Sequence, residues 1–353
     1  MIGAGIAGAS LAAELAPHAE VLLLEAEDLP GYHSTGRSAA FWSESYGGPL
    51  VQPLTTASGP LLCGFLKERG ALHVACDAEG AAALDAREGE FAGGAVELER
   101  VDPRTLVPGL RAGWGQALWE PSCADIDVAG LHAAYLKQAR RGGARLVADA
   151  RLERAERSGG LWRLETGAGS FEAAVLVDAA GAWADQVAAA AGIEPLGIRA
   201  FRRTIAQLRV SPPVPAGLPL VIDANGGFYF KPEAGGRLWL SPHDETPCVA
   251  CDAAAEELDV ALAIDRLERA VDWRVERLER SWAGLRSFAP DRLPVYGFEP
   301  VRSDFFWFAG QGGFGIQTAP AAARLAAALL LGRPADPSVA HIDLAPYSPA
   351  RFR

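Results

Sequence analysis

The hydrophobic pattern at the start of the chain predicts a tight turn, a helix and a buried strand in immediate succession. Glycines stand at Gly3, Gly5 and Gly8, and an Ala- and Leu-rich run follows them. The apolar run 21–24 comes next and is closed by the acid Glu25. A glycine-rich turn, a helix and a strand that ends in a carboxylate are together typical of dinucleotide-binding folds.

Each part of this motif has a physical role. The first two glycines let backbone N–H groups approach a pyrophosphate, the third lets the helix pack close to the sheet, and the helix N-terminus favours phosphate charge. Glu25 lies 17 positions beyond Gly8, where a carboxylate can accept hydrogen bonds from a ribose diol. Only Met1 and Ile2 precede the motif, although a strand usually has about five residues. A misassigned start, a truncated chain and a shortened strand all remain open.

Further apolar runs, separated by Gly and Pro, predict the remaining elements. An Asp at position 127 is placed to cap the helix at 128–141, and the run 171–177 is mostly apolar without clear alternation, as a strand covered on both faces would be. We predict helices at residues 54–69, 128–141, 252–269 and from the glycines after residue 310 to residue 331. We predict strands at residues 72–76, 95–98, 115–119, 144–147, 161–166, 171–177, 202–208, 228–232, 238–240 and 305–309.

This order predicts an α/β protein of two lobes, which a chain of 353 residues is long enough to form. The first lobe is a Rossmann-like nucleotide-binding domain made of residues 1–45, 126–198 and 276–353. The second, of α+β character, is a substrate domain built on a mixed sheet from residues 46–125 and 199–275.

Composition narrows the choice of partners. The net charge of −11 argues against nucleic acid and anionic membranes as partners. No run of about 20 apolar residues predicts a membrane span. Five cysteines, few and odd in number, favour a reducing compartment, so we expect a soluble, cytoplasmic protein. Cys248 and Cys251 form the only CxxC pair; without a second pair it predicts no zinc site, and we expect a plain loop before a helix.

Two further segments have residues that are suited to contacting a nucleotide. The polar run 29–40 supplies hydroxyls, backbone amides and one Arg, which suits a second anion contact. Residues 310–318 place four glycines between a buried strand and a helix, so backbone N–H groups there can meet a flat or anionic group.

With these motifs in this order, the chain resembles the FAD-dependent D-amino acid oxidase/dehydrogenase family, and within it the bacterial D-arginine dehydrogenases. The resemblance covers nearly the whole chain. It implies non-covalent FAD, and an Asn is common in the family where this chain has Asp178. The FAD contacts that the motifs and the resemblance imply are Gly3, Gly5, Ile6, Ala7, Gly8, Glu25, Ala26, Ser34, Thr35, Arg37, Ser38, Ala39, Ala40, Ala180, Gly181, Trp183, Gly310, Gly312, Gly313, Phe314, Gly315, Ile316 and Gln317.

The resemblance also implies a substrate site. Arg286 matches the family's carboxylate-binding Arg, and a guanidinium can bind a carboxylate through two parallel hydrogen bonds. Tyr229 matches a Tyr that hydrogen-bonds the same carboxylate, and Tyr46 matches a Tyr that closes over the pocket. Arg202 or Arg203 matches a further pocket Arg; neighbouring strand residues face opposite ways, and we favour Arg203.

Two positions depart from the arginine-directed relatives. Phe41 stands where they carry a His, and Ala71 aligns with a carboxylate that would pair with a guanidinium side chain. A cationic side chain buried without that carboxylate would be costly. We therefore expect an aromatic pocket of Phe41, Tyr46, Tyr229 and Phe314 that takes neutral or apolar D-amino acids; the stereochemistry follows from the resemblance alone. No general base is evident, since His33 lies in the flavin loop.

The implied activity is FAD-dependent oxidative deamination. A hydride passes from the substrate Cα to flavin N5, and the imino acid hydrolyses to a 2-oxo acid and ammonia, with an unidentified electron acceptor (O₂, a quinone or an electron carrier). Two alternatives stay open. One is oxidation of glycine, sarcosine or another secondary amine by the same carboxylate clamp. The other is a nucleotide-binding protein without turnover.

Overall fold

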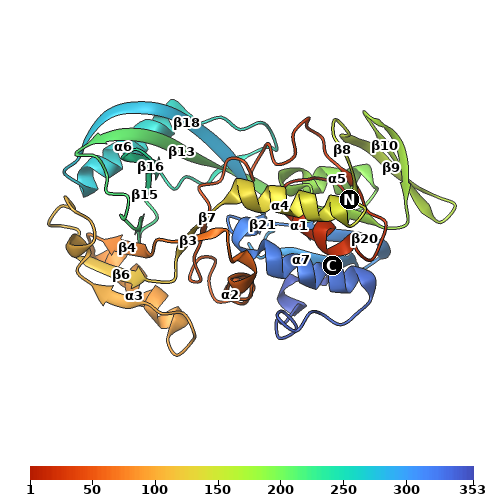
Figure 1. The fold of residues 1–353 in the computed structure, drawn as a ribbon, viewed down its shortest axis with the longest axis horizontal. Helices are drawn as coiled ribbons and strands as arrows, with labels where there is room; N and C mark the ends of the chain where they lie inside the picture. The colour runs from red at the N-terminus through yellow and green to blue at the C-terminus, as the bar shows by residue number, and fades with distance from the viewer.

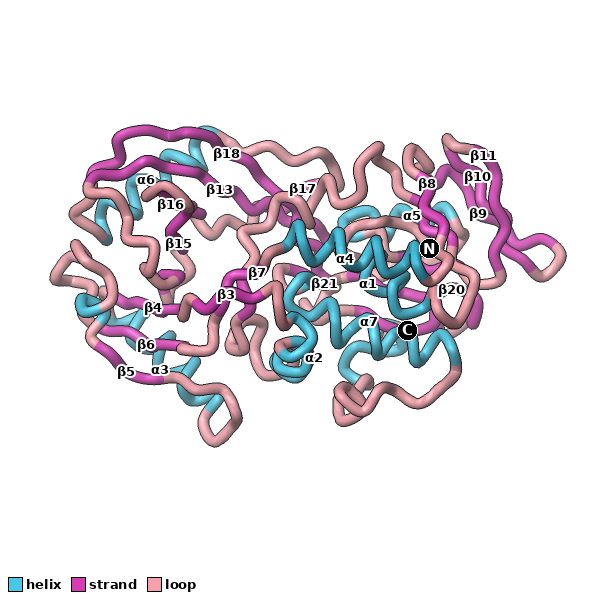
Figure 2. The backbone as a smooth tube through the Cα atoms, viewed as in Figure 1, coloured by secondary structure: helices cyan, strands magenta, loops and turns pink.

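The structure is a computed structural model that describes all 353 residues. The molecule is elongated (Figure 1). Helices α1, α4 and α7 and strands β9 and β10 lie towards one end, and the long strands β13 and β18 arch over the other, where β4, β6 and α3 also lie. Figure 2 shows that loops of very different length join these elements. None of the helices combines the length and the hydropathy that crossing a membrane requires.

The helices are α1 (Ile6–Leu15), α2 (Gln52–Ser58), α3 (Ala78–Phe91), α4 (Val128–Arg141), α5 (Ala184–Ala190), α6 (Glu257–Ala270) and α7 (Gly315–Leu331), with 3-10 turns η1 (Pro60–Leu62), η2 (Pro103–Thr105), η3 (Gly181–Trp183), η4 (Ala345–Tyr347) and η5 (Pro349–Phe352). The strands are β1 (Leu22–Leu24), β2 (Phe41–Trp42), β3 (Leu66–Glu68), β4 (Ala71–Ala75), β5 (Glu99–Val101), β6 (Gln116–Glu120), β7 (Ala124–Ile126), β8 (Arg145–Val147), β9 (Leu152–Ser158), β10 (Leu161–Thr166), β11 (Gly169–Ala173), β12 (Leu176–Asp178), β13 (Arg199–Ser211), β14 (Leu220–Asp223), β15 (Tyr229–Glu233), β16 (Arg237–Ser241), β17 (Thr246–Cys248), β18 (Arg274–Phe288), β19 (Val295–Glu299), β20 (Arg302–Ala309) and β21 (Gln311–Gly312). The prediction of an α/β protein is confirmed.

A single residue takes the place of the first strand. Ile2 forms parallel bridges to both Leu24 and Asp178. Its backbone N–H donates to the Val177 carbonyl oxygen at 2.9 Å, and the Gly3 N–H donates to the Leu24 carbonyl oxygen at 2.8 Å. Ile2 thus joins the parallel pair β1–β8 to the pair β12–β20, and the glycine turn that follows it lies in the middle of this parallel arrangement.

Small residues let the helices at this end pack closely. Helix α1 contacts both α4 and α7, and Ala9, Ala12 and Ala13 of α1 are fully buried between them. A Cβ added to Gly8 would lie 1.9 Å from the Gly3 carbonyl oxygen. Gly8 therefore sets the distance between helix and turn, as the motif predicts for its third glycine.

The other half of the molecule is organised by a ten-stranded mixed sheet. Its strand order is β21-β18-β13-β16-β15-β14-β4-β6-β5, with β17 also paired to β13. The pair β14–β4 is parallel and the other pairs are antiparallel. Helix α6 packs Val260, Ala263 and Leu267 into the apolar core of this sheet. Strands β13 and β18 are the longest strands of the sheet, and the end of β18 pairs with β21 just before α7.

The predictions for individual elements had mixed outcomes. The helix at 128–141 and the strand at 161–166 are confirmed. The predicted helix at 54–69 is wrong beyond residue 58, because Gly59 and Pro60 end α2 and the chain then forms η1 and β3. The predicted strand at 171–177 is also wrong: it is two strands, β11 in a hairpin and β12 in the parallel sheet. The strand predicted at 95–98 forms instead at 99–101, as β5.

Candidate active site

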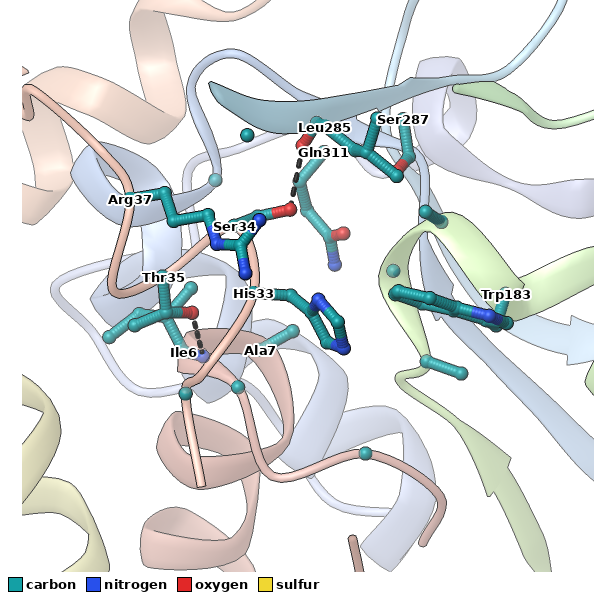
Figure 3. A pocket seen from close by; sticks show the side chains of 18 of the residues that line it. Ile6, Ala7, His33, Ser34, Thr35, Arg37, Trp183, Leu285, Ser287 and Gln311 are labelled. Atoms are coloured by element: carbon teal, nitrogen blue, oxygen red, sulfur yellow. Dashed lines mark hydrogen bonds between the residues drawn. The ribbon is translucent and has the colours of Figure 1, made fainter. Parts of the chain in front are cut away.

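A main cavity of about 300 Å³ lies where the two halves of the molecule meet. Its walls come from the glycine turn and the start of α1, the end of β1, residues 31–39, residues 179–187, the ends of β13, β15 and β18, and residues 311–316. A smaller side pocket of about 30 Å³ adjoins it and shares Ser38, Ala39, Tyr229, Arg286, Gly313 and Ile316 with it. Segments far apart in the sequence thus build one site, part of which is drawn in Figure 3.

The glycine turn has the shape that a dinucleotide requires. Gly3 has φ +96°, and a Cβ there would lie 2.6 Å from the Ala179 carbonyl oxygen, so only glycine fits. Helix α1 has no acidic residue in its first turn, which leaves its N-terminal N–H groups and positive dipole end available to phosphate. The Ile6 N–H donates to the Thr35 hydroxyl oxygen at 2.9 Å (Figure 3).

Glu25 is part of the turn itself. One carboxylate oxygen accepts the Ala4 N–H at 2.8 Å, and the other accepts the Glu27 N–H at 3.1 Å. The side chain is buried and lines the main cavity. A carboxylate can accept about four hydrogen bonds, so Glu25 fixes the turn and keeps capacity for a ribose diol.

The loop 31–39 is anchored across the cavity. The Ser34 hydroxyl donates to the Leu285 carbonyl oxygen at 2.6 Å, as Figure 3 shows. The Arg37 guanidinium donates to the carbonyl oxygens of Ala253 at 2.7 Å and Ala283 at 3.2 Å and pairs with the Asp252 carboxylate. The Arg37 guanidinium therefore uses its N–H groups to hold the loop. The sequence, in contrast, predicts that this Arg contacts an anion.

The opposite wall is made by the residues that follow β12. Ala180, Gly181 and Trp183 all line the cavity. The Trp183 ring lies 4.5 Å from the His33 ring, centre to centre, and the two face each other in Figure 3. The His33 imidazole is bonded to Glu27 at 3.0 Å, consistent with a structural role.

Asp178 lies directly beneath this wall. One of its carboxyl oxygens accepts the Ala180 N–H at 3.1 Å, and the other is buried without a partner. Burial raises the pKa of this carboxyl well above its usual range. A neutral carboxyl carries both a donor and an acceptor, as an Asn amide does, so Asp178 can make the contacts of the Asn that is common at this position.

Of the FAD contacts predicted at residues 310–317, some line the main cavity and others lie in the core or the side pocket. Gly312, Gly313, Gly315 and Ile316 line the main cavity. Gly8, Gly310 and Phe314 lie behind its wall; Phe314 belongs to a buried cluster with Val51 and Phe288. Ala40 and Gln317 line only the side pocket. The remaining predicted contacts, Gly5, Ala7, Ala26, Ser38 and Ala39, line the main cavity.

Two guanidiniums and one phenol, of Arg203, Arg286 and Tyr229, line the cavity together. Phe201 pairs with Arg286, and Arg203 pairs with Gly284, across the antiparallel strands β13 and β18, so Arg203 and Arg286 share one face of the sheet. Both line the cavity with Tyr229. Arg202 points to the other face, where it pairs with Asp259 at 2.9 Å and with Glu256.

The two cavity arginines differ in how they are held. Arg203 is buried, and it donates to the Asp244 carbonyl oxygen at 2.6 Å and to Glu245 at 3.2 Å, while its Nη1 has no partner. The Arg286 guanidinium makes no hydrogen bond within the chain, and its nearest carboxylate oxygen, on Glu245, is 3.9 Å away. Arg292 shares the same Glu245 carboxylate at 2.8 Å. Three guanidiniums around one carboxylate form a site that favours a further anion.

The same positive charges act on His243, which packs edge-on against Tyr229 with ring centres 5.5 Å apart. Burial, followed by the charges of Arg203 and Arg286, lowers the pKa of His243 to about 2. The ring is therefore neutral and a very weak base at physiological pH, so it does not supply the missing general base.

Aromatic rings enclose the side pocket. The Phe41 ring lies 5.5 Å from the Tyr46 ring and 6.3 Å from the Tyr229 ring, centre to centre. The Arg286 guanidinium lies over the Tyr46 ring at 5.9 Å. Phe314, which the sequence also predicts in this pocket, supports Tyr46 from outside the pocket lining.

Sequence reasoning missed Glu120. This carboxylate is fully buried and lies directly across from Ala71 on the neighbouring strand. It accepts the Glu44 N–H at 2.7 Å and the hydroxyls of Ser43 at 3.0 Å and Ser45 at 2.6 Å. A charged residue directly after the apolar run 117–119 is the only signal in the sequence.

The loop that carries Tyr46 is thus fixed from two sides. In addition to Glu120, the buried amide of Gln317 accepts the Ser43 N–H at 3.1 Å and donates to the Tyr46 carbonyl oxygen at 3.2 Å and the Thr55 hydroxyl at 2.9 Å. The Gln317 amide is therefore occupied in positioning this loop, whereas the sequence predicts Gln317 as an FAD contact.

The sequence and the fold are similar to those of known proteins. The model of the family described as FAD dependent oxidoreductase (DAO) matches residues 1–329. A glycine oxidase of Geobacillus kaustophilus is 27% identical over 383 aligned positions, which cover 99% of this chain and 96% of that protein. The solved structure of glycine oxidase from Geobacillus kaustophilus has a TM-score of 0.86 at 24% identity, covering 100% of this chain and 98% of that one. The structure of L-proline dehydrogenase from P. horikoshii has a TM-score of 0.86 at 22% identity, with 99% and 96% covered.

Proposed function

Since the chain belongs to the FAD dependent oxidoreductase (DAO) family, and is therefore an FAD-dependent oxidoreductase, we propose that it deaminates glycine and small neutral D-amino acids. The observation that carries this proposal is the Arg286 guanidinium, which is free of hydrogen bonds within the chain and lies beside a side pocket of only about 30 Å³. Similarity to a glycine oxidase over nearly the whole chain supports the same substrate class.

The residues around the main cavity fit FAD. A turn that admits only glycine, a helix N-terminus without acids and a carboxylate at the end of β1 suit its pyrophosphate and ribose. When bound, FAD supplies the redox chemistry by accepting two electrons and hydrogen from the substrate carbon. The protein's own task is to position the substrate and to set its protonation state.

We assign the positioning to three side chains. Arg286 binds the substrate carboxylate through two parallel hydrogen bonds, Tyr229 donates its hydroxyl to the same group, and the unpartnered Nη1 of Arg203 adds positive charge from within the protein. Fixing the carboxylate fixes the carbon beside it, and an oriented carbon is what this reaction needs from the site.

The same charges reduce the need for a general base. Arg203, Arg286 and Arg292 surround a single carboxylate, Glu245. Positive charges disfavour a second positive charge nearby, so the substrate amine loses its proton more readily in the site than in water. We propose that the amine is bound in its neutral form and that the proton leaves to solvent.

The size and the charge of the pocket argue against D-arginine as the substrate, although the sequence resembles the bacterial D-arginine dehydrogenases. Phe41, Tyr46 and Tyr229 enclose the side pocket, and a long side chain would need them to move. The Glu120 carboxylate near Ala71 is turned to the loop hydroxyls. A cationic side chain would meet two guanidiniums and no free carboxylate.

A secondary amine is the second candidate. Sarcosine and proline present the same carboxylate to Arg286, and the similarity in fold to an L-proline dehydrogenase favours this class. In such a substrate the additional carbon is bonded to the amine nitrogen and would lie away from the carboxylate clamp. The choice between the two candidates therefore depends on the space on the amine side of the site.

The test is an anaerobic substrate panel. Purified protein with FAD is mixed with glycine, D-alanine, sarcosine, L-proline, L-alanine and D-arginine, and the oxidised flavin absorbance is followed. Rapid bleaching by glycine and D-alanine supports the proposal, and bleaching by sarcosine or L-proline alone supports the second candidate. Preference for D-arginine would contradict both. Admitting air to the bleached sample then shows whether O₂ is the electron acceptor.

A further inference from the structure

Two thiols lie in contact beside the cavity. Cys248 ends β17, which pairs with β13 so that Cys248 is opposite Ala200. Cys251 follows in the loop before α6, and the two sulfur atoms are 3.5 Å apart. Both side chains are partly exposed, so solvent and small thiol reagents can reach them.

The arrangement suits redox chemistry between the two thiols. Of the other cysteines, Cys123 is buried, and Cys63 and Cys76 have no thiol partner. No group of three or more His, Cys, Asp or Glu side chains is placed to hold a metal ion, so these two sulfurs lack the further ligands of a zinc site. The two sulfur atoms are already within 3.5 Å, so a small movement brings them to the disulfide bond length of about 2.05 Å.

The segment that carries the thiols is joined to the cavity wall by packing. Cys248 and Cys251 pack on a buried apolar cluster that contains Ala283 and Leu285, and Ala182 packs on the same cluster. Leu285 and Ala182 also line the main cavity. The thiol pair is therefore one layer of side chains away from the FAD site.

A second connection runs through Arg37 of the loop 31–39. Its guanidinium pairs with the carboxylate of Asp252, the residue after Cys251, and donates to the carbonyl oxygen of Ala253 at 2.7 Å. These two partners and the Ala283 carbonyl oxygen hold Arg37. A change in the path of residues 248–253 therefore moves the anchor of a loop that lines the cavity.

We propose that Cys248 and Cys251 form a reversible disulfide that weakens the binding of FAD. In the reaction, one thiolate attacks a low-molecular-weight disulfide such as oxidised glutathione and releases one thiol. The second cysteine then attacks the mixed disulfide, forms the Cys248–Cys251 bond and releases the second thiol. Two protons and two electrons leave the cysteines, and the small disulfide becomes two small thiols.

The direction of the effect follows from geometry. A disulfide requires the sulfur atoms to approach from 3.5 Å to about 2.05 Å, which draws Cys248 and Cys251 together and shifts Asp252. The hydrogen bonds to Arg37 exist in the dithiol form, so the disulfide form holds the loop less well. By linkage, FAD must oppose disulfide formation by the same factor by which the disulfide weakens FAD binding.

The test uses the full-length protein with FAD bound, equilibrated in glutathione buffers from fully reduced to fully oxidised. Alkylation and peptide mass spectrometry should show a Cys248–Cys251 crosslink, with three free thiols left of five. Released FAD is followed by its fluorescence, and we expect the affinity for FAD to be about fivefold weaker or more in the oxidised form, which appears mainly as faster release. Excess free FAD should move the glutathione midpoint towards the dithiol.

Two variants complete the experiment. Cys248→Ser removes the pair and should give the same FAD release rate in both buffers, while Cys63→Ser, at an exposed thiol elsewhere, should behave as the unaltered protein. Absence of the crosslink in the most oxidising buffer would overturn the proposal. A crosslink that leaves both FAD release and the glutathione midpoint unchanged would overturn the link to FAD.

Discussion

The charge in this site depends on which side chains of β13 and β18 face the cavity. Arg202 and Arg203 are neighbours in sequence, yet Arg202 pairs with Glu256 and Asp259 on the far face and Arg203 is buried in the cavity with an unpartnered nitrogen. The alternation of a strand predicts that one of them faces in, but only the register of β13 against β18 shows which one. The local motif predicts the glycine turn and Glu25, because those contacts are close in sequence.

Arg286→Ala tests the carboxylate clamp. Loss of a bidentate charged contact should lower kcat/KM by about 2–4 kcal/mol, or about 30-fold to 900-fold, and FAD should stay bound because Arg286 is not among the predicted FAD contacts. Steady-state kinetics with glycine and the visible flavin spectrum measure both. Arg202→Ala is the matched control, on the opposite face of the same sheet, and should keep kcat/KM. An Arg286→Ala variant with unaltered kinetics would refute the clamp.

Asp178→Asn tests whether the buried carboxyl is neutral. The pKa of Asp178 is raised in the folded protein, so its stabilising effect is complete below the unfolded pKa of about 3.9. That effect is lost as pH rises towards the folded pKa, because the unfolded state releases the proton first. Asn has no proton to lose, so the variant should gain in Tm relative to the parent between pH 5 and pH 8. A Tm difference independent of pH would show that Asp178 is ionised in the fold.

At the scale of elements, contacts across the sequence place the loop 43–46. Glu120 at the end of β6 holds Ser43 and Ser45, some 75 residues earlier, and Gln317 of α7 holds the same loop. No local pattern predicts such pairs. Local pattern did predict α4, whose Asp127 cap and amphipathic face lie within one segment, and it failed at 54–69, where Gly59 and Pro60 end the helix.

Glu120→Ala should loosen this loop and with it Tyr46. It leaves buried hydroxyls and backbone N–H groups without an acceptor, at a cost of about 3 kcal/mol in unfolding free energy. A displaced Tyr46 should raise KM for glycine more than it lowers kcat. Glu120→Gln keeps one carbonyl oxygen, so its stability and KM should lie between those of the parent and those of Glu120→Ala. Urea unfolding and steady-state kinetics measure these effects. Glu99→Gln, at an exposed position on the adjacent strand β5, is the control and should change neither.

At the scale of the whole molecule, one cavity is walled by both halves of the chain. The turn after Ile2 and the loop 31–39 come from the first 40 residues, and β18 brings residues 284–287 to the same cavity from the large sheet. Ser34 and Arg37 connect these segments directly, through Leu285 and Ala283. A ligand that fills the cavity therefore contacts parts of the chain that fold on different sheets.

FAD should consequently stabilise segments from both halves at once. At a free FAD concentration 100 times its Kd, binding adds about 2.7 kcal/mol to the free energy of unfolding, and amide exchange that proceeds through global opening slows by the same factor of about 100. Hydrogen–deuterium exchange with and without FAD should show added protection at residues 3–8 and 34–39, and also at 284–287 and 311–316. The exposed hairpin β9–β10 serves as the internal reference, because its residues beyond Leu152 lie outside the cavity lining. Protection confined to the first 40 residues would mean that FAD binds without closing the cavity against the large sheet, and the positions of Arg286 and Tyr229 relative to FAD would then have to be revised.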